Sequence, residues 1–362
     1  MTKNKKIIFT SGGTGGHIFP AIGIMNYLST KGYTVVFVTD PRGHKYIEKN
    51  MKFKCYTLNT DTLAYKSIFR KILSIVKIFF SVLNSFFILK NEKPNLIFGL
   101  GGYVSFPVSI ASKILNIPLV IYEGNIILGK TNKYLLPLAK KLLVANEEIS
   151  NYSKKYSNKI YNVGNILRND VFEKFSTKKK GDEKKFSILV LGGSQGAKIF
   201  GDIVPETIKK IKDKGYDINI YQQCIAIQKN SLINYYNNNS IENNVFEFSN
   251  NIFDLISRAD LVISRCGAST SAELVQMQAP FIAVPYPIAV DNHQLFNAKY
   301  YEKKGCCWLL EQYKFNSNNL FNLIMQILKD RKVLDHIREN MKKNFNKDVN
   351  KNVERELMSC FK

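Results

Sequence analysis

The sequence has few residues of the kinds that hold metals or crosslink a chain. Its six cysteines form no Cys-x-x-Cys pair, and there are only four histidines in 362 residues. The beginning of the sequence does not resemble a signal peptide, so we interpret the cysteines as reduced thiols of a cytoplasmic protein. A disulfide framework and a structural zinc site are therefore disfavoured, and we expect no metal and no other cofactor.

Long uncharged apolar runs are also missing. No stretch reaches the roughly 20 apolar residues that a membrane-spanning helix needs, and the best candidate, residues 67–89, is interrupted by Arg70, Lys71 and Lys77. Its polar residues fall on one stripe at helical spacing, and the rest is Ile, Leu, Val or Phe. Two interpretations stay open: a helix buried against its own domain on most sides, or a helix that dips part of its apolar face into a membrane surface, with lysines on the headgroups. The candidates for insertion are Ile75, Phe79, Phe80, Val82, Phe86 and Phe87.

Acidic residues are scarce relative to basic ones. There are 52 Lys and Arg against 29 Asp and Glu, a formal net charge of +23. Such an excess is compatible with nucleic-acid binding, with an anionic lipid surface, or with solvated charge in a lysine-rich composition. The sequence shows no arginine-rich helix and no basic strand with interleaved aromatic residues, so nucleic-acid binding is the least favoured of the three.

Three glycine-rich loops each follow a strand-like run. Residues 11–17 read Ser-Gly-Gly-Thr-Gly-Gly-His, residues 99–103 read Gly-Leu-Gly-Gly-Tyr, and residues 192–197 read Gly-Gly-Ser-Gln-Gly-Ala. Glycines let the backbone turn sharply and approach a ligand closely, and a helix N-terminus that follows such a loop favours an anion. The first and last loops begin two α/β patterns about 180 residues apart, which predicts two similar domains and a phosphate-bearing ligand.

The order of the remaining segments supports two α/β domains with parallel sheets, which also suits the chain length. Apolar runs alternate with helical patterns, and the lysine-rich residues 178–185 indicate an exposed loop just after the seam, which we expect near 164–172. The predicted strands are 6–10, 34–39, 53–58, 95–99, 119–122, 141–145 and 160–163, then 187–191, 217–221, 245–248, 261–264, 281–284 and 307–310.

Several polar segments follow these predicted strands. The segment 265–273 contains hydroxyls at a helix start and Glu273, whose carboxylate suits a ribose diol. The alternative for Glu273 is a capping box on its own helix. The Asp-Asn-His-Gln sequence at 291–294 offers sugar-binding side chains, or a polar helix start. Glu123 and Asn125 follow another strand, and Arg168 near the seam either neutralises a diphosphate or is a surface arginine.

Taken together, these motifs resemble the MurG family of bacterial glycosyltransferases in order and spacing, over essentially the whole chain. The matching segments are 12–17, 99–103, 192–197, 265–268 and 291–294. The resemblance implies a GT-B architecture, that is, two Rossmann-like domains facing a cleft and a C-terminal helix that returns to the N-terminal domain. It implies an acceptor- and membrane-facing domain of residues 1–164 plus about 343–362, and a donor-binding domain of residues 165–342.

The resemblance also implies an activity and a location. Members of the family transfer N-acetylglucosamine from UDP-N-acetylglucosamine to lipid I, an undecaprenyl-diphosphate-linked N-acetylmuramoyl-pentapeptide, and so make lipid II. They are peripheral at the cytoplasmic face of the cell membrane. The residues that match the family's substrate contacts are Thr14, Gly15, Gly16, Asn125, Arg168, Ser194, Ser249, Ala268, Ser269, Thr270, Ser271, Ala272, Glu273 and Gln294. Three positions depart from the commonest pattern: Tyr122 replaces a histidine, Gly124 a glutamine and Ile166 a proline.

The expected reaction is an inverting attack of a sugar hydroxyl on the anomeric carbon, which expels UDP. The sequence contains no Asp-x-Asp pair, so loop amides, helix N-termini and Arg168 are expected to stabilise the leaving diphosphate without a metal. His17 lies in the first glycine loop and its ordinary pKa is near neutrality, which favours it as general base or as an acceptor-positioning residue. Glu123 is the competing base, and the alternative for His17 is a structural hydrogen bond to the loop.

Four other functions stay open from the residues alone. Asp40 ends the second strand as the ribose-binding acid of a nicotinamide dehydrogenase would, although Ile18 occupies the place of that motif's third glycine. A UDP-N-acetylglucosamine 2-epimerase would share the architecture without needing the apolar segment 67–89. Another membrane-lipid glycosyltransferase is the nearest alternative, and a basic nucleic-acid-binding module is the most remote.

Overall fold

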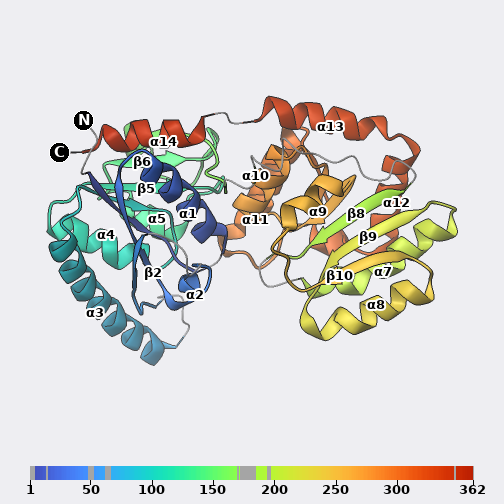
Figure 1. Ribbon diagram of the computed structural model, residues 1–362, viewed down its shortest axis with the longest axis horizontal. Helices are drawn as coiled ribbons and strands as arrows, with labels where there is room; N and C mark the ends of the chain where they lie inside the picture. Colours follow the sequence, from blue (N-terminus) through green and yellow to red (C-terminus); the bar gives the residue numbers. More distant parts are fainter. Residues whose placement is uncertain are drawn as a thin grey trace. The chain divides into compact units, whose positions relative to one another are not determined.

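The computed structural model describes residues 5–13, 15–47, 53–61, 67–168, 171, 185–193, 197–345 and 348–361. The chain forms two compact units, Met1–Arg168 with Lys347–Lys362, and Asn169–Asn346. Each contains a sheet with helices on its faces (Figure 1). The first unit extends to Arg168, so this arginine lies at its end and not at the start of the second unit.

The first unit is built on a seven-stranded parallel sheet of order β3-β2-β1-β4-β5-β6-β7. Its strands are β1 (Lys6–Thr10), β2 (Thr34–Thr39), β3 (Lys54–Thr57), β4 (Leu96–Gly99), β5 (Leu119–Glu123), β6 (Lys141–Val144) and β7 (Ile160–Asn162). Its α-helices are α1 (Gly15–Thr30), α2 (Pro41–His44), α3 (Ile68–Glu92), α4 (Ser105–Ile114), α5 (Lys130–Leu135) and α14 (Val349–Met358), with a 3-10 helix η1 at Lys154–Lys159.

Helices cover both faces of this sheet, which is why its central strands are apolar at successive positions. Ile7 and Phe9 of β1 pack in one core with α1 and α14, whereas Ile8 packs in the other with α3 and α4. Side chains of a strand alternate between faces, so one short run serves two cores. Val353 of α14 is fully buried in the first of these cores, and the expected return of a C-terminal helix to the N-terminal domain is thus confirmed.

The second unit repeats the plan with a six-stranded parallel sheet of order β10-β9-β8-β11-β12-β13. Its strands are β8 (Phe186–Leu191), β9 (Ile218–Gln223), β10 (Glu242–Phe246), β11 (Leu261–Ser264), β12 (Phe281–Ala283) and β13 (Cys307–Leu309). Its α-helices are α7 (Lys198–Asp213), α8 (Lys229–Asn238), α9 (Ile252–Arg258), α10 (Ala268–Gln276), α11 (His293–Lys303), α12 (Ser317–Lys329) and α13 (Lys332–Lys343), with 3-10 helices η2 (Ala226–Gln228), η3 (Val290–Asn292) and η4 (Gln312–Lys314).

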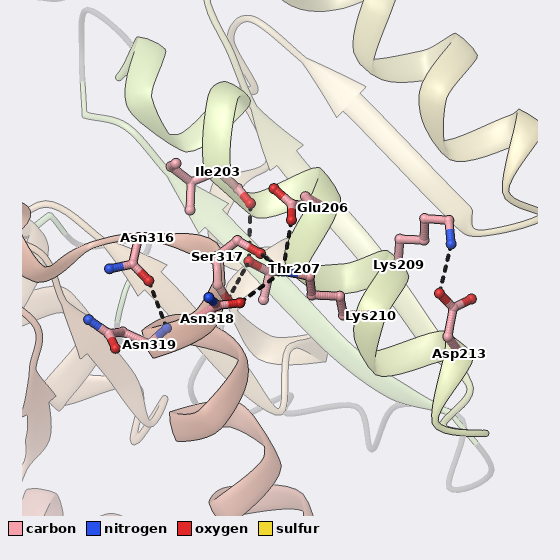
Figure 2. A network of polar contacts seen from close by, with 10 residues as sticks. All are labelled: Ile203, Glu206, Thr207, Lys209, Lys210, Asp213, Asn316, Ser317, Asn318 and Asn319. Atoms are coloured by element: carbon pink, nitrogen blue, oxygen red, sulfur yellow. Dashed lines mark hydrogen bonds and ion pairs between the residues drawn. The ribbon is translucent and has the colours of Figure 1, made fainter.

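Helix α7, which follows the glycine loop 192–197, is fixed to α12 by a polar network (Figure 2). Lys210 pairs with Glu206 at 2.7 Å on its own helix. It also donates to Ser317 Oγ and Asn318 Oδ1 at the start of α12, both at 2.9 Å. The hydroxyl of Thr207, fully buried, donates to Ile203 O at 3.1 Å. The helix that follows the glycine loop 192–197 is therefore held by packing and by directed hydrogen bonds together.

The predicted strands correspond to the observed ones, with one clear displacement. Strand β10 begins at Glu242, three residues before the predicted start at 245. It is the edge strand, paired only to β9 among the described residues, and Glu242 and Asn244 on it are exposed. An edge strand needs fewer apolar residues because part of it faces water, so the apolar pattern signals only its end.

Helix α3 corrects one of the two interpretations of residues 67–89. It is not buried on most sides. Only Ser74, Ser81, Ser85, Leu89 and Glu92 are buried, and the helix is the one among the described residues that is long and apolar enough to cross a membrane by length and composition. The large exposed side chains of α3 are Ile68, Phe69, Ile72, Leu73, Ile75, Val76, Phe79, Phe80, Leu83 and Phe87, between 38% and 76% accessible. Of the candidates for insertion, Val82 and Phe86 are half-buried.

The buried stripe of α3 is its serine stripe. Ser81 Oγ donates to Lys77 O at 2.8 Å and Ser85 Oγ to Ser81 O at 2.7 Å, so these hydroxyls are satisfied within the helix and their small side chains face the domain. At the helix end, Glu92 forms ion pairs with Lys6 at 2.9 Å and Lys54 at 2.6 Å. The helix is thus docked through its polar side and presents its apolar side outward.

Candidate functional site

Four neighbouring strands of the first sheet, β2, β1, β4 and β5, end in the polar and glycine-rich segments singled out in the sequence. Because the strands are parallel, their carboxyl ends lie at one edge of the sheet, where open α/β sheets bind ligands. The loop 11–13 follows β1, the loop 100–104 follows β4, Asp40 follows β2 and Glu123 ends β5. The sheet order thereby collects segments more than 100 residues apart.

The glycine loop that follows β1 and the one that follows β4 interlock. Gly12 N donates to Gly101 O at 3.3 Å. Gly102 has a φ of +82°, and a Cβ there would lie 2.4 Å from Gly12 O, so no side chain fits between the loops. A Cβ on Gly101, whose φ is +100°, would lie 3.0 Å from Nδ1 of His17. The half-buried imidazole of His17 therefore rests on the backbone of the loop that follows β4.

Asp40 supports the first glycine loop from the side. Its Oδ1 accepts hydrogen bonds from Gly13 N at 3.1 Å and Gly43 N at 2.7 Å, and its Oδ2 pairs with Arg42 at 2.9 Å. Burial opposes ionisation, but the amides of Gly43 and Gly13 and the guanidinium of Arg42 hold the pKa of Asp40 below its usual value. A carboxylate engaged in this way is not presented to a ribose, which removes the feature that favoured a nicotinamide dehydrogenase.

Glu123 is likewise engaged with its own loop. It is 4% exposed. Its Oε1 accepts from Asn125 N at 3.1 Å and from Asn125 Nδ2 at 2.9 Å, and its Oε2 accepts from Gly129 N at 2.9 Å and from Asn132 Nδ2 at 3.0 Å. Four donors surround the two oxygens, so the carboxylate fixes the turn that carries Asn125.

Arg168 lies against the first turn of α1, the helix that follows the first glycine loop. Its guanidinium carbon is 4.6 Å from the centroid of the Phe19 ring, and Phe19 is in the same helical turn as Gly16 and His17. The interaction of a guanidinium with an aromatic face is favourable and fixes its plane. The structure thus gives Arg168 a defined place, which the sequence alone left open.

In the second unit, the loop that follows β8 is supported by Gln223, whose Oε1 accepts from Gly192 N at 3.1 Å. Gly193 has a φ of +81°, which favours glycine. Thr14 of the first glycine loop and Ser194 of this one lie outside the described residues. Ser249, beyond β10, is half-buried, and its Oγ accepts from Asn251 N at 3.1 Å.

The start of α10 corrects the capping-box alternative. The N-cap residue is Gly267, and it forms no side-chain capping hydrogen bond. The third helical position is then Thr270, so Glu273 is too far along the helix to complete a capping box. Gly267, Ala268, Ser269 and Thr270 are half-buried, whereas Ser271 and Ala272 are buried. The helix start that the sequence predicted is therefore partly accessible, with Glu273 on the same helix.

Gln294 links this helix start to the segment after β12. Its Oε1 accepts from Cys266 N at 3.2 Å and from Tyr286 N at 2.9 Å. Two consecutive residues before it, Asp291 and Asn292, have left-handed φ values of 52° and 54°. Asp and Asn tolerate this conformation better than other non-glycine residues, and such strain is concentrated at functional sites.

Sequence reasoning missed several supports of the second-unit site. Asn297 Nδ2 donates to Cys266 O at 3.0 Å. Arg265, 8% exposed, donates to Val284 O at 3.1 Å and lies 5.0 Å from the Phe200 ring centroid. Asn297 lies one helical turn after His293, on the face of α11 that holds Gln294. This spacing could have predicted that Asn297 belongs to the same site.

Comparison with known proteins identifies the family. Residues 7–144 match the glycosyltransferase family 28 N-terminal domain, and residues 187–353 match the glycosyltransferase family 28 C-terminal domain. The chain belongs to glycosyltransferase family 28. The two matched domains correspond to the two sheets, β1 to β6 in one and β8 to β13 in the other.

Relatives within glycosyltransferase family 28 match nearly the full chain. The chain is 36% identical to the UDP-N-acetylglucosamine--N-acetylmuramyl-(pentapeptide) pyrophosphoryl-undecaprenol N-acetylglucosamine transferase of Rickettsia canadensis, over 93% of this chain and 94% of that protein. It is 33% identical to the protein of the same name from Pelagibacter ubique, over 93% of each.

Solved structures agree with this assignment. The chain resembles the crystal structure of Acinetobacter baumannii MurG with a TM-score of 0.79 and 25% identity, over 98% of this chain and 99% of that one. A UDP-GlcNAc 2-epimerase from Neisseria meningitidis has a TM-score of 0.69 at 14% identity, over 98% of this chain and 100% of that one, which reflects a shared fold. The expected pair of Rossmann-like domains of the GT-B type is confirmed.

Proposed function

We infer that this chain is a hexosyltransferase that moves N-acetylglucosamine from UDP-N-acetylglucosamine to lipid I, the undecaprenyl-diphosphate-linked N-acetylmuramoyl-pentapeptide. The product is lipid II, the precursor of cell-wall peptidoglycan. The observation that carries this conclusion is the full-length match to transferases of that name, at 36% identity over 93% of the chain.

We propose that His17 is the general base, or orients the acceptor hydroxyl for attack. It is half-buried in the first turn of α1, where the loops after β1 and β4 meet. The hydroxyl of the acceptor sugar must lose a proton as it attacks, and a titratable group within hydrogen-bond reach accelerates this step. Glu123 is the weaker candidate because four hydrogen bonds already occupy its oxygens.

We propose that the leaving UDP is stabilised by fixed positive groups. Negative charge develops on the diphosphate as the glycosidic bond breaks. Preorganised amides at helix starts and an arginine lower the free energy of that state without having to reorganise. Arg168, stacked on Phe19, is the proposed cation, and the amides at the start of α10 are proposed donors.

We also propose that this chain contacts the donor through the residues that match the family's substrate contacts. They comprise Thr14, Gly15, Gly16, Asn125, Arg168, Ser194, Ser249, Ala268, Ser269, Thr270, Ser271, Ala272, Glu273 and Gln294. Gln294 has its carbonyl oxygen committed to Cys266 N and Tyr286 N. Its amide group would then be the part that meets the sugar.

We propose that the protein is peripheral at the cytoplasmic face of the membrane and attaches through the apolar face of α3. Phe69, Phe79 and Phe80 are 70%, 59% and 58% exposed. Exposed aromatic residues on one helix, in a protein of net charge +23, fit an anionic lipid surface. An undecaprenyl-linked acceptor resides in such a surface.

The test is transfer of labelled N-acetylglucosamine from UDP to a lipid I analogue. Label should enter the lipid fraction when UDP-N-acetylglucosamine is the donor and the lipid I analogue is the acceptor. Replacing the donor by UDP-glucose, or the acceptor by a diacylglycerol, should give little product. Transfer to the glycerolipid would instead indicate another lipid glycosyltransferase. Conversion of the donor without any acceptor would indicate an epimerase.

A further inference from the structure

Tyr122 is a buried tyrosine near the end of β5, and both hydrogen bonds of its hydroxyl go to one distant segment. Its hydroxyl donates to Gly164 O at 3.3 Å and accepts from Ile166 N at 3.0 Å. The side chain is 6% exposed. Burial raises the pKa of Tyr122 well above its usual value, so the hydroxyl keeps its proton and acts as donor and acceptor at once.

The bond to Ile166 depends on a backbone N–H that a proline at this position would lack. Gly164 turns the segment with a φ of +92°, and its amide is held by Asn162 Oδ1 at 3.2 Å.

The segment ends at Arg168, whose guanidinium stacks on Phe19. Leu167 O contacts α1 closely, since a Cβ on Gly23 would lie 2.7 Å from it. The direction in which Arg168 leaves this contact is set by the backbone of residues 164–167. Tyr122 is the side chain that fixes that backbone to the sheet at two points.

We propose that Tyr122 is a positioning residue for Arg168. Its hydroxyl holds the 164–166 backbone so that the guanidinium is presented in one orientation. The idea rests on the proposed function, which assigns Arg168 to the diphosphate of the donor. A planar guanidinium binds phosphate oxygens through a fixed fork of donors, and misplacement by about 1 Å is sufficient to weaken a preorganised site.

The experiment is a double-mutant cycle with Tyr122→Phe and Arg168→Ala in the full-length protein. Tyr122→Phe keeps the buried ring and removes only the hydroxyl. In the wild-type background it should raise KM for UDP-N-acetylglucosamine, and Kd for UDP by calorimetry, about 5- to 20-fold. KM for the lipid I analogue should change less than about twofold. In the Arg168→Ala background the same substitution should change the donor constants less than about twofold.

Tyr236→Phe is the matched control, because Tyr236 is a fully buried tyrosine whose hydroxyl donates to Gln222 in the second unit. It should lower thermal stability as much as Tyr122→Phe does, or more, without affecting the donor constants. The proposal is overturned if Tyr122→Phe leaves these constants unchanged, or changes them equally in both backgrounds. A wild-type protein that binds UDP but transfers no sugar would refute the proposed function, while the calorimetric cycle would still test Tyr122.

Discussion

At the scale of single residues, two buried carboxylates of the first unit support the loops around them. Asp40 accepts from the amides of Gly13 and Gly43, and Glu123 accepts from those of Asn125 and Gly129. Each closes a turn at the end of a strand. A carboxylate that satisfies buried amides is costly to replace, because the amides would remain buried without acceptors.

Substitution of His17 should affect the rate of sugar transfer without affecting the binding of UDP. His17→Ala should lower kcat by about 10²- to 10⁴-fold, the usual contribution of a general acid–base group, while Kd for UDP changes less than about twofold. Steady-state transfer assays and calorimetry measure the two quantities. An unchanged kcat would remove His17 from catalysis.

The sequence predicted at which strand and helix ends these polar residues lie better than it predicted their hydrogen-bond partners. Gln294 was expected to contact sugar, but that its Oε1 would join two loops was not foreseen. Tyr122 appeared only as a departure from a pattern, although its hydroxyl bridges residues 164 and 166. Residue type and spacing indicate where a side chain lies, whereas its hydrogen-bond partners depend on backbone atoms far away in the sequence.

At the scale of elements, the inner strands were predictable because both of their faces are buried. Strands β1, β4 and β8 lie inside their sheets and consist mostly of buried apolar residues, a pattern that local sequence alone reveals. Strand β10 and helix α3 are the exceptions. In β10 exposed polar residues form part of a strand, and in α3 the apolar residues face outward.

Glu92 should make the docking of α3 sensitive to acid. Burial opposes its ionisation, but hydrogen bonds from Lys54, Tyr56 and Lys6 lower the pKa of Glu92 to about 2, from an ordinary value of 4.5. A depressed carboxylate pKa stabilises the folded state above about pH 4.5, and this contribution is lost as the pH falls toward 2. The stabilisation is about 1–2 kcal/mol, since both lysines remain partly in solvent.

Glu92→Gln should therefore lower the free energy of unfolding at pH 7 by about that amount, and the difference from wild type should shrink below pH 4.5. Urea unfolding over a pH series measures this. Asp335→Asn serves as the control, because Asp335 is 73% exposed in a surface pair with Arg338 and should have little effect. A difference that is the same at pH 7 and pH 3 would contradict the ionic explanation.

At the scale of the whole molecule, net charge and the apolar face of α3 should act together at a lipid surface. Phe79→Ser with Phe80→Ser should reduce binding to vesicles rich in phosphatidylglycerol by about tenfold or more, because two large apolar side chains no longer enter the lipid. Co-sedimentation measures the bound fraction.

The matched control for that pair is Ile227→Ser with Tyr313→Ser, two side chains of the second unit that are 86% and 75% exposed. This control should bind vesicles as the wild type does. Transfer to a water-soluble acceptor analogue should be unchanged in both double variants. Equal loss of vesicle binding in the two would show that α3 has no special role.

The place of α14 in the first unit has a consequence for the order in which the protein acquires its structure during translation. The second unit is one continuous stretch, Asn169–Asn346, whereas the first needs Lys347–Lys362 as well. Val349, Val353 and Leu357 of α14 complete the core around β1 and α1, and they leave the ribosome only after the whole second unit has been made. Since domains generally fold as units while the chain emerges, the half that is made first is the half that is finished last. Until α14 has been made, the side chains of this core that α14 covers stay exposed. A nascent chain stalled before residue 347 should therefore contain a folded second unit and an incomplete first unit.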